Sequence, residues 1–178
     1  MSATVCRVAA IALPGLHGTT VLVEAAVSTQ LPGMAIIGLP DAALAEAKQR
    51  VRLATQQMGL ALSERFIVVN LSPAALPKQG SGFDLAIALA ALAASGKVPG
   101  GSLTDTAHLG ELSLDGALRR PPGLLSAVLA ARELGFRRVM VPAQGAREAA
   151  LVPGIEVIAA RDLRDAVSWY RDEGKHWK

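Results

Sequence analysis

The chain of 178 residues is long enough for one domain with a substantial core, or for two very small domains. Hydrophobic residues make up 51% but aromatic residues only 3%, so a core must be built from Ala, Leu, Val and Ile. The net charge of +3 is mildly basic, well below the dense positive charge of dedicated nucleic-acid binders. The few aromatic residues argue against a protein that binds single strands by stacking bases on aromatic side chains. One cysteine excludes an internal disulfide and fits a cytoplasmic protein, while no apolar run reaches the roughly 18 residues of a membrane helix.

The first half of the chain predicts three strands and then a helix. The segments 4–12, 19–28 and 34–38 are rich in β-forming residues, and a tight turn would make the first two antiparallel. Residues 41–58 predict a helix with Asp41 as its N-cap and Gly59 as its end. Its apolar stripe consists of Leu44, Ala47, Val51, Ala54 and Met58. Three basic residues lie off this stripe and are expected either on a solvated face or in contact with an anionic partner: Lys48, Arg50 and Arg52.

The second half predicts alternating helices and strands. A strand over 65–70 leads through a Gly-rich loop into a helix over 83–94, which is apolar all round and should be buried. Further strands are expected at 107–114, 117–118, 137–141 and 155–159, and further helices at 121–134, 143–151 and 162–172. We therefore expect a single domain over 1–172 and a frayed tail over 173–178, the edge before a further domain.

The Gly-rich loop that ends in Gly80-Ser81-Gly82 lies between a strand and a helix, where phosphate sites and nucleophiles are often placed. It lacks the P-loop pattern and the third glycine of a dinucleotide-binding motif, since position 85 is Leu. The chain also lacks GxSxG, and its three histidines show no metal-ligand spacing, so no metal site is expected. Ser81 and Asp84, three residues apart, instead predict a helix cap.

Three long motifs carry a resemblance to a known family. They read LPGMAIIGLPD at 31–41, NLSPAALPKQG at 70–80 followed by FDL at 83–85, and GELSLDG at 110–116 followed by LR at 118–119. In this order they resemble the N-terminal domain of the ComM/YifB family of Mg-chelatase-like AAA+ ATPases. The resemblance implies an α/β (α+β) fold like the Lon proteolytic domain and the second domain of a small-subunit ribosomal protein, with three opening strands before alternating helices and strands.

The resemblance also implies that the catalytic dyad of Lon-like peptidases is lost. The nucleophilic serine of those peptidases aligns with Gly82, and their base lysine aligns with Leu125. Glycine has no nucleophile and leucine accepts no proton, so we expect no enzyme activity in this domain. A Lon-like serine peptidase that uses Ser81 with a non-standard lysine, Lys78 or Lys97, is the alternative.

The family resemblance places ATP and Mg in an ATPase domain downstream, and it implies no cofactor here. The expected partners are that AAA+ domain, further copies of the chain in a hexamer, and DNA, with no membrane. The function implied is an accessory domain for assembly or DNA contact in a motor implicated in branch migration during natural transformation. Five basic residues are possible contacts to DNA or a partner, or else plain surface charges: Lys78, Arg119, Arg120, Arg137 and Arg138.

Overall fold

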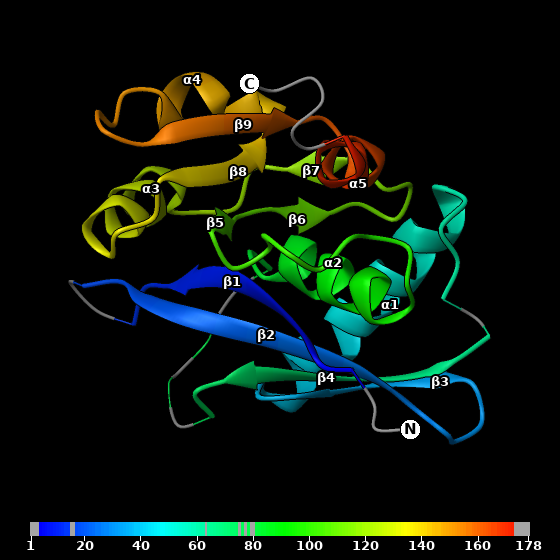
Figure 1. Cartoon of the computed structure of the whole chain (residues 1–178). Helices are drawn as coiled ribbons and strands as arrows, with labels where there is room; N and C mark the ends of the chain where they lie inside the picture. The colour runs from blue at the N-terminus through cyan, green and yellow to red at the C-terminus, as the bar shows by residue number, and fades with distance from the viewer. Residues whose placement is uncertain are drawn as a thin grey trace.

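A computed structural model describes residues 4–14, 17–62, 64–74, 76, 78 and 81–172, so the tail expected over 173–178 lies outside the described residues. Seven strands form one mixed sheet in the order β3-β4-β2-β1-β5-β8-β9, and β6 and β7 form a separate pair (Figure 1). The strands are β1 (Cys6–Ala12), β2 (Thr19–Ser28), β3 (Gly33–Ile37), β4 (Phe66–Ser72), β5 (Thr106–His108), β6 (Glu111–Leu112), β7 (Leu118–Arg119), β8 (Arg138–Pro142) and β9 (Glu156–Ala160). The helices are α1 (Asp41–Gln57), α2 (Asp84–Ala94), α3 (Leu124–Glu133), the 3₁₀ turn η1 (Ala143–Gly145), α4 (Ala146–Ala149) and α5 (Leu163–Arg171).

In the seven-stranded sheet of the described residues, β2 runs opposite to the other six strands. β1 pairs with β2 and β2 with β4, both antiparallel, so the antiparallel opening pair predicted from the sequence is confirmed. The pairs β3–β4, β1–β5, β5–β8 and β8–β9 are all parallel. Three opening strands followed by alternating helices and strands therefore give the mixed α/β fold expected from the sequence.

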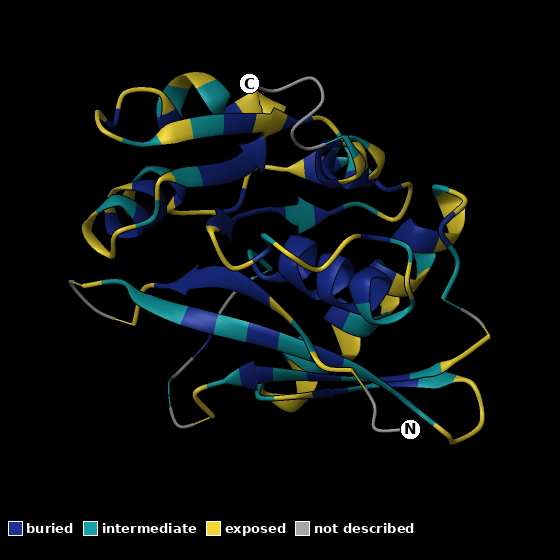
Figure 2. Cartoon of the chain, in the orientation of Figure 1, coloured by how far each residue is buried: buried dark blue, intermediate teal, exposed yellow. Residues whose placement is uncertain are grey.

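Two hydrophobic clusters lie on opposite faces of the sheet. Helices α1, α2 and α5 pack on one face against alternate residues of the strands, such as Val8 and Ala10 of β1. Helices α3 and α4 cover the other face near β5 and β8, where Ile11 of β1 joins their cluster. Along β2 the colours of Figure 2 alternate between buried and intermediate, since alternate side chains point to opposite faces.

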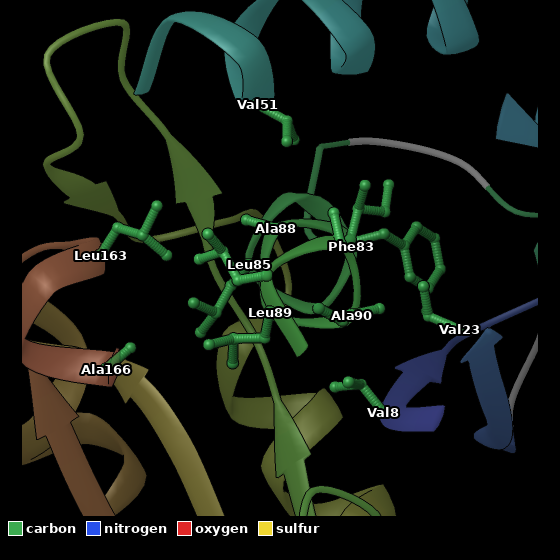
Figure 3. Packing of buried hydrophobic residues seen from close by; sticks show 14 of the residues in the cluster. Val8, Val23, Val51, Phe83, Leu85, Ala88, Leu89, Ala90, Leu163 and Ala166 are labelled. Carbon is green, nitrogen blue, oxygen red and sulfur yellow. The ribbon is translucent and has the colours of Figure 1, made fainter. Parts of the chain in front are cut away.

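Helix α2 is the centre of the larger cluster, and its residues from Asp84 to Ala93 are all buried. Figure 3 shows Leu85 and Leu89 directed towards Leu163 and Ala166 of α5, and Ala90 towards Val8 of β1. The prediction of a helix buried all round is thus confirmed. Its many alanines matter because small side chains let strands and helices approach it closely from several sides.

Helix α5 is fixed to the sheet by a buried polar contact. His108 of β5 is fully buried, with Nδ1 2.9 Å from the Ala9 carbonyl oxygen and Nε2 2.5 Å from the Tyr170 hydroxyl. Both neighbours are satisfied when Nδ1–H donates to Ala9 and Nε2 accepts from Tyr170, which is the neutral tautomer. Burial in an apolar environment disfavours the charged ring and lowers the pKa of His108 from 6.5 to about 4.

Some element boundaries predicted from the sequence are wrong. Among the described residues no side chain caps α1: Pro40 holds the N-cap position and Asp41 is the first helical residue. The strand expected over 107–114 is interrupted: the N–H of Leu109 still bonds Met140 of β8, but the N–H of Gly110 bonds the Gly82 carbonyl oxygen outside the sheet. The helix expected from Pro121 begins only at Leu124, after a glycine with φ of 75°. The helix expected over 143–151 is the short pair η1 and α4.

Candidate functional site

Ser81 lies just before α2, and its hydroxyl donates a hydrogen bond to the Glu111 carboxylate of β6. The expectation that Ser81 and Asp84 cap the helix is wrong. In the described residues α2 has no side-chain cap: Phe83 holds the N-cap position, and only the backbone oxygen of Ser81 accepts from the N–H of Asp84, at 3.1 Å. The Ser81 side chain is directed instead to a residue 30 positions away, which local spacing could not reveal.

Asp84 forms the best-defined polar contact of this region. It is 1% exposed and accepts from Arg50 Nε at 2.6 Å, from Arg50 Nη2 at 3.1 Å and from the backbone N–H of Leu112 at 3.0 Å. This bidentate pair joins α1, α2 and β6 at one point. Arg50, which the sequence placed on a solvated face or against an anionic partner, is in fact a structural residue of the site.

The electrostatics of the pair follow from its burial. Desolvation raises the pKa of Asp84, while the hydrogen bonds from Arg50 and Leu112 act in the opposite direction. The hydrogen bond to Asp84 raises the pKa of Arg50, which stays protonated. Glu46, one turn before Arg50 on α1, lies 3.8 Å from the same guanidinium and is 71% exposed.

Two clefts meet at Ser81. The first, which we call the apolar cleft, has a volume of about 400 Å³ and lies among the end of β1, the start of α2 and the start of α3. Its lining residues are Ile11, Ala12, Leu13, Pro14, Ser81, Gly82, Phe83, Leu109, Pro121, Pro122, Leu124 and Ala127. The second, which we call the acidic cleft, has a volume of about 380 Å³ and is lined by Ala43, Glu46, Arg50, Ser81 and Glu111.

Gly82 and Leu125, the two positions aligned with a peptidase dyad, do not come together as a reactive pair. Gly82 lines the apolar cleft, where a Cβ would make an ordinary contact at 3.5 Å with the Cβ of Pro121. Leu125 is half-buried and packs against the cluster under α3. Neither side chain offers a nucleophile or a base, so the chemistry available at the cleft rests on Ser81 and Glu111.

The two lysines considered as partners of Ser81 are held elsewhere. Lys78 is only 2% exposed, its Nζ donates to the Leu76 carbonyl oxygen at 2.9 Å, and desolvation lowers its pKa. The Nζ of Lys97 donates to the Ala61 carbonyl oxygen at 2.7 Å. The expectation that Lys78 offers a surface cation to DNA or a partner is therefore wrong.

The four arginines proposed as contacts lie in two separate regions. The exposed Arg119 donates from Nε to Ser113 Oγ at 2.5 Å, and Arg120 forms an ion pair with Glu148 at 2.5 Å. Arg137 is exposed, and the guanidinium of Arg138 lies 6.0 Å from the ring centre of Trp169. Arg137 and Arg138 line a cavity of about 700 Å³ whose other charged residues are Asp105 and Glu156, so its formal charge is balanced.

Among the residues that the structure describes, no three His, Cys, Asp or Glu side chains gather into a possible metal site. Across the same part of the chain, no helix combines the length and apolar character needed to cross a bilayer.

Comparison of the sequence with known proteins places this chain in a family. Residues 23–145 match the family model described as "Subunit ChlI of Mg-chelatase". The chain is 46% identical over 165 residues to an uncharacterized protein of Mycobacterium tuberculosis, covering 93% of this chain and 33% of that protein. It is 37% identical over 162 residues to YifB of Escherichia coli, covering 91% of this chain and 31% of that protein. It is 36% identical over 161 residues to competence protein ComM of Haemophilus influenzae, covering 90% of this chain and 31% of that protein.

The chain therefore belongs to the ComM/YifB family of Mg-chelatase-like proteins, and it spans about one third of the length of these relatives. A weaker similarity extends to Lon protease of Mycolicibacterium smegmatis, which is 29% identical over 163 residues, covering 86% of this chain and 20% of that protein. This similarity is consistent with the Lon-like α/β fold.

Proposed function

We propose that this chain is a non-catalytic accessory domain of a Mg-chelatase-like AAA+ motor, where it serves assembly and contact with DNA. The observation that carries the proposal is the kind of side chain at the two aligned dyad positions and at Ser81, just before α2. Gly82 and Leu125 occupy the positions of the peptidase dyad, and the nearby serine is bonded to the Glu111 carboxylate rather than to a lysine. A fold similar to that of a peptidase domain, combined with these side chains, supports a domain that has a role other than peptide cleavage.

The rest of the parent protein supplies the context of this proposal. Because the chain spans about one third of its relatives, ATP and Mg are expected to bind in the remaining part. The proposed role in DNA processing is supported by the name of the Haemophilus influenzae relative, "Competence protein ComM". A motor of this kind would act on DNA in the cytoplasm, and branch migration in natural transformation is the reaction that we propose.

The assembly role is tested in the full-length parent. Light scattering in the presence of ATP should give a hexamer for the parent, and a smaller species when residues 1–172 are deleted. The deletion variant must still bind ATP, because that shows the remaining part to be folded. A deletion variant that binds ATP and remains a hexamer would refute the assembly role.

We propose Arg119 and Arg137 as the contacts to DNA, because both side chains are exposed. A phosphate contact predicts that binding of the chain to DNA weakens as the salt concentration rises. The slope of the logarithm of the binding constant against the logarithm of the salt concentration should decrease in magnitude by about one for each contact removed. Arg119→Gln and Arg137→Gln should each reduce this slope, whereas Arg7→Gln should leave it unchanged. Arg7 is a suitable control because it is an exposed arginine paired with Glu24 at 2.9 Å. Binding that does not depend on salt contradicts the DNA role.

The alternative function is a serine peptidase that uses Ser81. It is tested by cleavage of fluorescent casein, with Ser81→Ala as the control variant. We expect equal background signals for the two proteins, since each lysine considered as a base already donates to a carbonyl oxygen. Cleavage by the wild type that the substitution abolishes would overturn the proposal of a non-catalytic domain.

A further inference from the structure

The two clefts at Ser81 differ in chemistry although they share this residue. The apolar cleft is lined by carbon-only side chains apart from the serine hydroxyl, and Ile11, Phe83 and Leu109 among them are buried. Its volume of about 400 Å³ is at the lower end of the range of small binding sites and accommodates one large apolar side chain. A ligand that fills it must therefore present an apolar group close to Ser81.

The acidic cleft on the other side of Ser81 carries an excess of negative charge. Its lining includes Glu46 and Glu111, and the buried Asp84 lies behind them, against the single cation Arg50. Arg50 is already engaged by both oxygens of Asp84, so its charge is balanced within the protein. Glu46 also lies 3.8 Å from this guanidinium, but three carboxylates, those of Glu46, Asp84 and Glu111, share the single positive charge of Arg50. The cleft keeps an excess of negative charge, so a ligand here should carry a positive charge.

Glu111 is suited to receive a cation at a fixed place. Its Oε2 accepts from Ser81, and the backbone of β6 is paired with β7 through Glu111 and Arg119. An ionised carboxylate has about four lone-pair sites, so one hydrogen bond leaves acceptors for a further donor. A guanidinium, which donates two parallel hydrogen bonds, matches such a carboxylate better than an ammonium.

The wall between the two clefts is held rigidly. The Arg50–Asp84 pair and the bond from the Leu112 N–H fix α1, α2 and β6 relative to one another immediately beside Ser81. A preformed site of this kind loses little conformational freedom on binding. The two clefts lie on either side of Ser81, which lines both, and we call them together the groove, with one apolar and one acidic half.

We propose that this groove binds an extended segment of another protein in which an apolar side chain lies within one or two residues of an arginine. The apolar side chain occupies the apolar cleft, and the arginine lies against Glu111 and Glu46. Charge complementarity selects this occupant, because a wholly apolar segment would leave the excess negative charge of the acidic cleft unbalanced. The inference goes beyond the proposed function and rests only on the clefts of this chain.

The experiment is a ¹⁵N-HSQC titration of the chain with three capped peptides. The probes are Ac-Ala-Leu-Arg-Leu-Ala-amide, the same peptide with Glu in place of Arg, and the same peptide with Ser in place of both Leu. The arginine peptide should shift the amide signals of Gly82, Phe83 and Glu111. It should bind at least about tenfold more tightly than either other peptide, since that factor corresponds to the loss of one good polar or apolar contact.

Two matched variants test the acidic half of the groove. Glu111→Gln keeps the size of the side chain, and in this variant the preference for the arginine peptide over the glutamate peptide should fall about tenfold. Glu156→Gln is the control, because Glu156 is an exposed glutamate lining the separate cavity of Arg137 and should leave the preference unchanged. If the Glu111 variant does not fold, Glu46→Gln on α1 replaces it, with a smaller loss of preference expected.

Several outcomes would overturn the inference. Equal responses to the three peptides, shifts confined to residues away from Ser81, or no shifts at a peptide concentration of about 10 mM each contradict it. Concentration-dependent shifts of Gly82 and Glu111 without any peptide would show that a second copy of the chain is the occupant, which also refutes the proposal.

Discussion

The buried His108 makes the stability of this fold depend on pH in a defined direction. In the folded protein the neutral ring donates to Ala9 and accepts from Tyr170, and its pKa is about 4, against 6.5 for an ordinary histidine side chain. Between these two values the unfolded chain binds a proton that the folded chain does not. The contribution of His108 is therefore complete above pH 6.5 and is lost as the pH falls towards 4.

The size of the effect follows from the two pKa values. The full difference between the two pKa values corresponds to about 3 kcal/mol, and about 2 kcal/mol of this is lost between pH 8 and pH 5. Urea unfolding of the wild type at these two pH values measures the change directly. The double variant His108→Phe/Tyr170→Phe removes the titrating ring and replaces both polar partners by rings of similar size.

The comparison between the two proteins isolates His108 from the carboxylates, which titrate in both. We expect the wild type to lose about 2 kcal/mol more than the double variant between pH 8 and pH 5. Tyr170→Phe alone retains the buried histidine and should keep most of the pH dependence. Equal losses in the wild type and the double variant would refute the assignment of a neutral, buried His108.

Three further predictions concern the packing around the site. Arg50→Met should destabilise the chain by about 3 kcal/mol in urea unfolding at pH 8, because it leaves Asp84 buried without its cation. The pKa of Asp84 should then rise further, so the loss should be smaller at pH 5; a loss that grows at pH 5 would contradict this. Gly38→Ala should lower the midpoint of thermal unfolding markedly, since Gly38 has φ of 101° and a Cβ would lie 2.5 Å from the Leu71 carbonyl oxygen. Gly82→Ser should keep the wild-type midpoint within a few degrees, because the new Cβ meets only ordinary contacts, and it should not create casein cleavage without a lysine at position 125.

Most of the fold could be predicted from local patterns. Each of three local signals reflects one element: the β-forming residues along 19–28, the apolar stripe from Leu44 to Met58 and the unbroken apolar run after Asp84. The structure confirms these elements because burial of their apolar residues agrees with their local preference. Predictions failed where a long-range contact outweighed the local signal, as when Gly110 bonds Gly82 and interrupts the strand expected over 107–114.

The candidate site shows the same division. Family motifs in the sequence identified Gly82 and Leu125 as the positions without catalytic side chains. The polar partners could not be identified in this way, because the Arg50–Asp84 pair joins residues 34 positions apart and the Ser81–Glu111 bond joins residues 30 apart. Spacing within one helix or loop carries no information about such contacts, so Ser81 and Asp84 were expected to cap a helix that they do not cap.

The sequence by itself determined the family, through its three long motifs, and the order of helices and strands, through residue type and local periodicity. Only the tertiary structure decided that Lys78 is buried, that Arg50 neutralises Asp84, and that Ser81 separates an apolar cleft from an acidic one. The physical reason is that burial, charge pairing and cavity shape arise where α1, α2 and β6 meet, and the packing of the whole sheet and its helices determines where they meet.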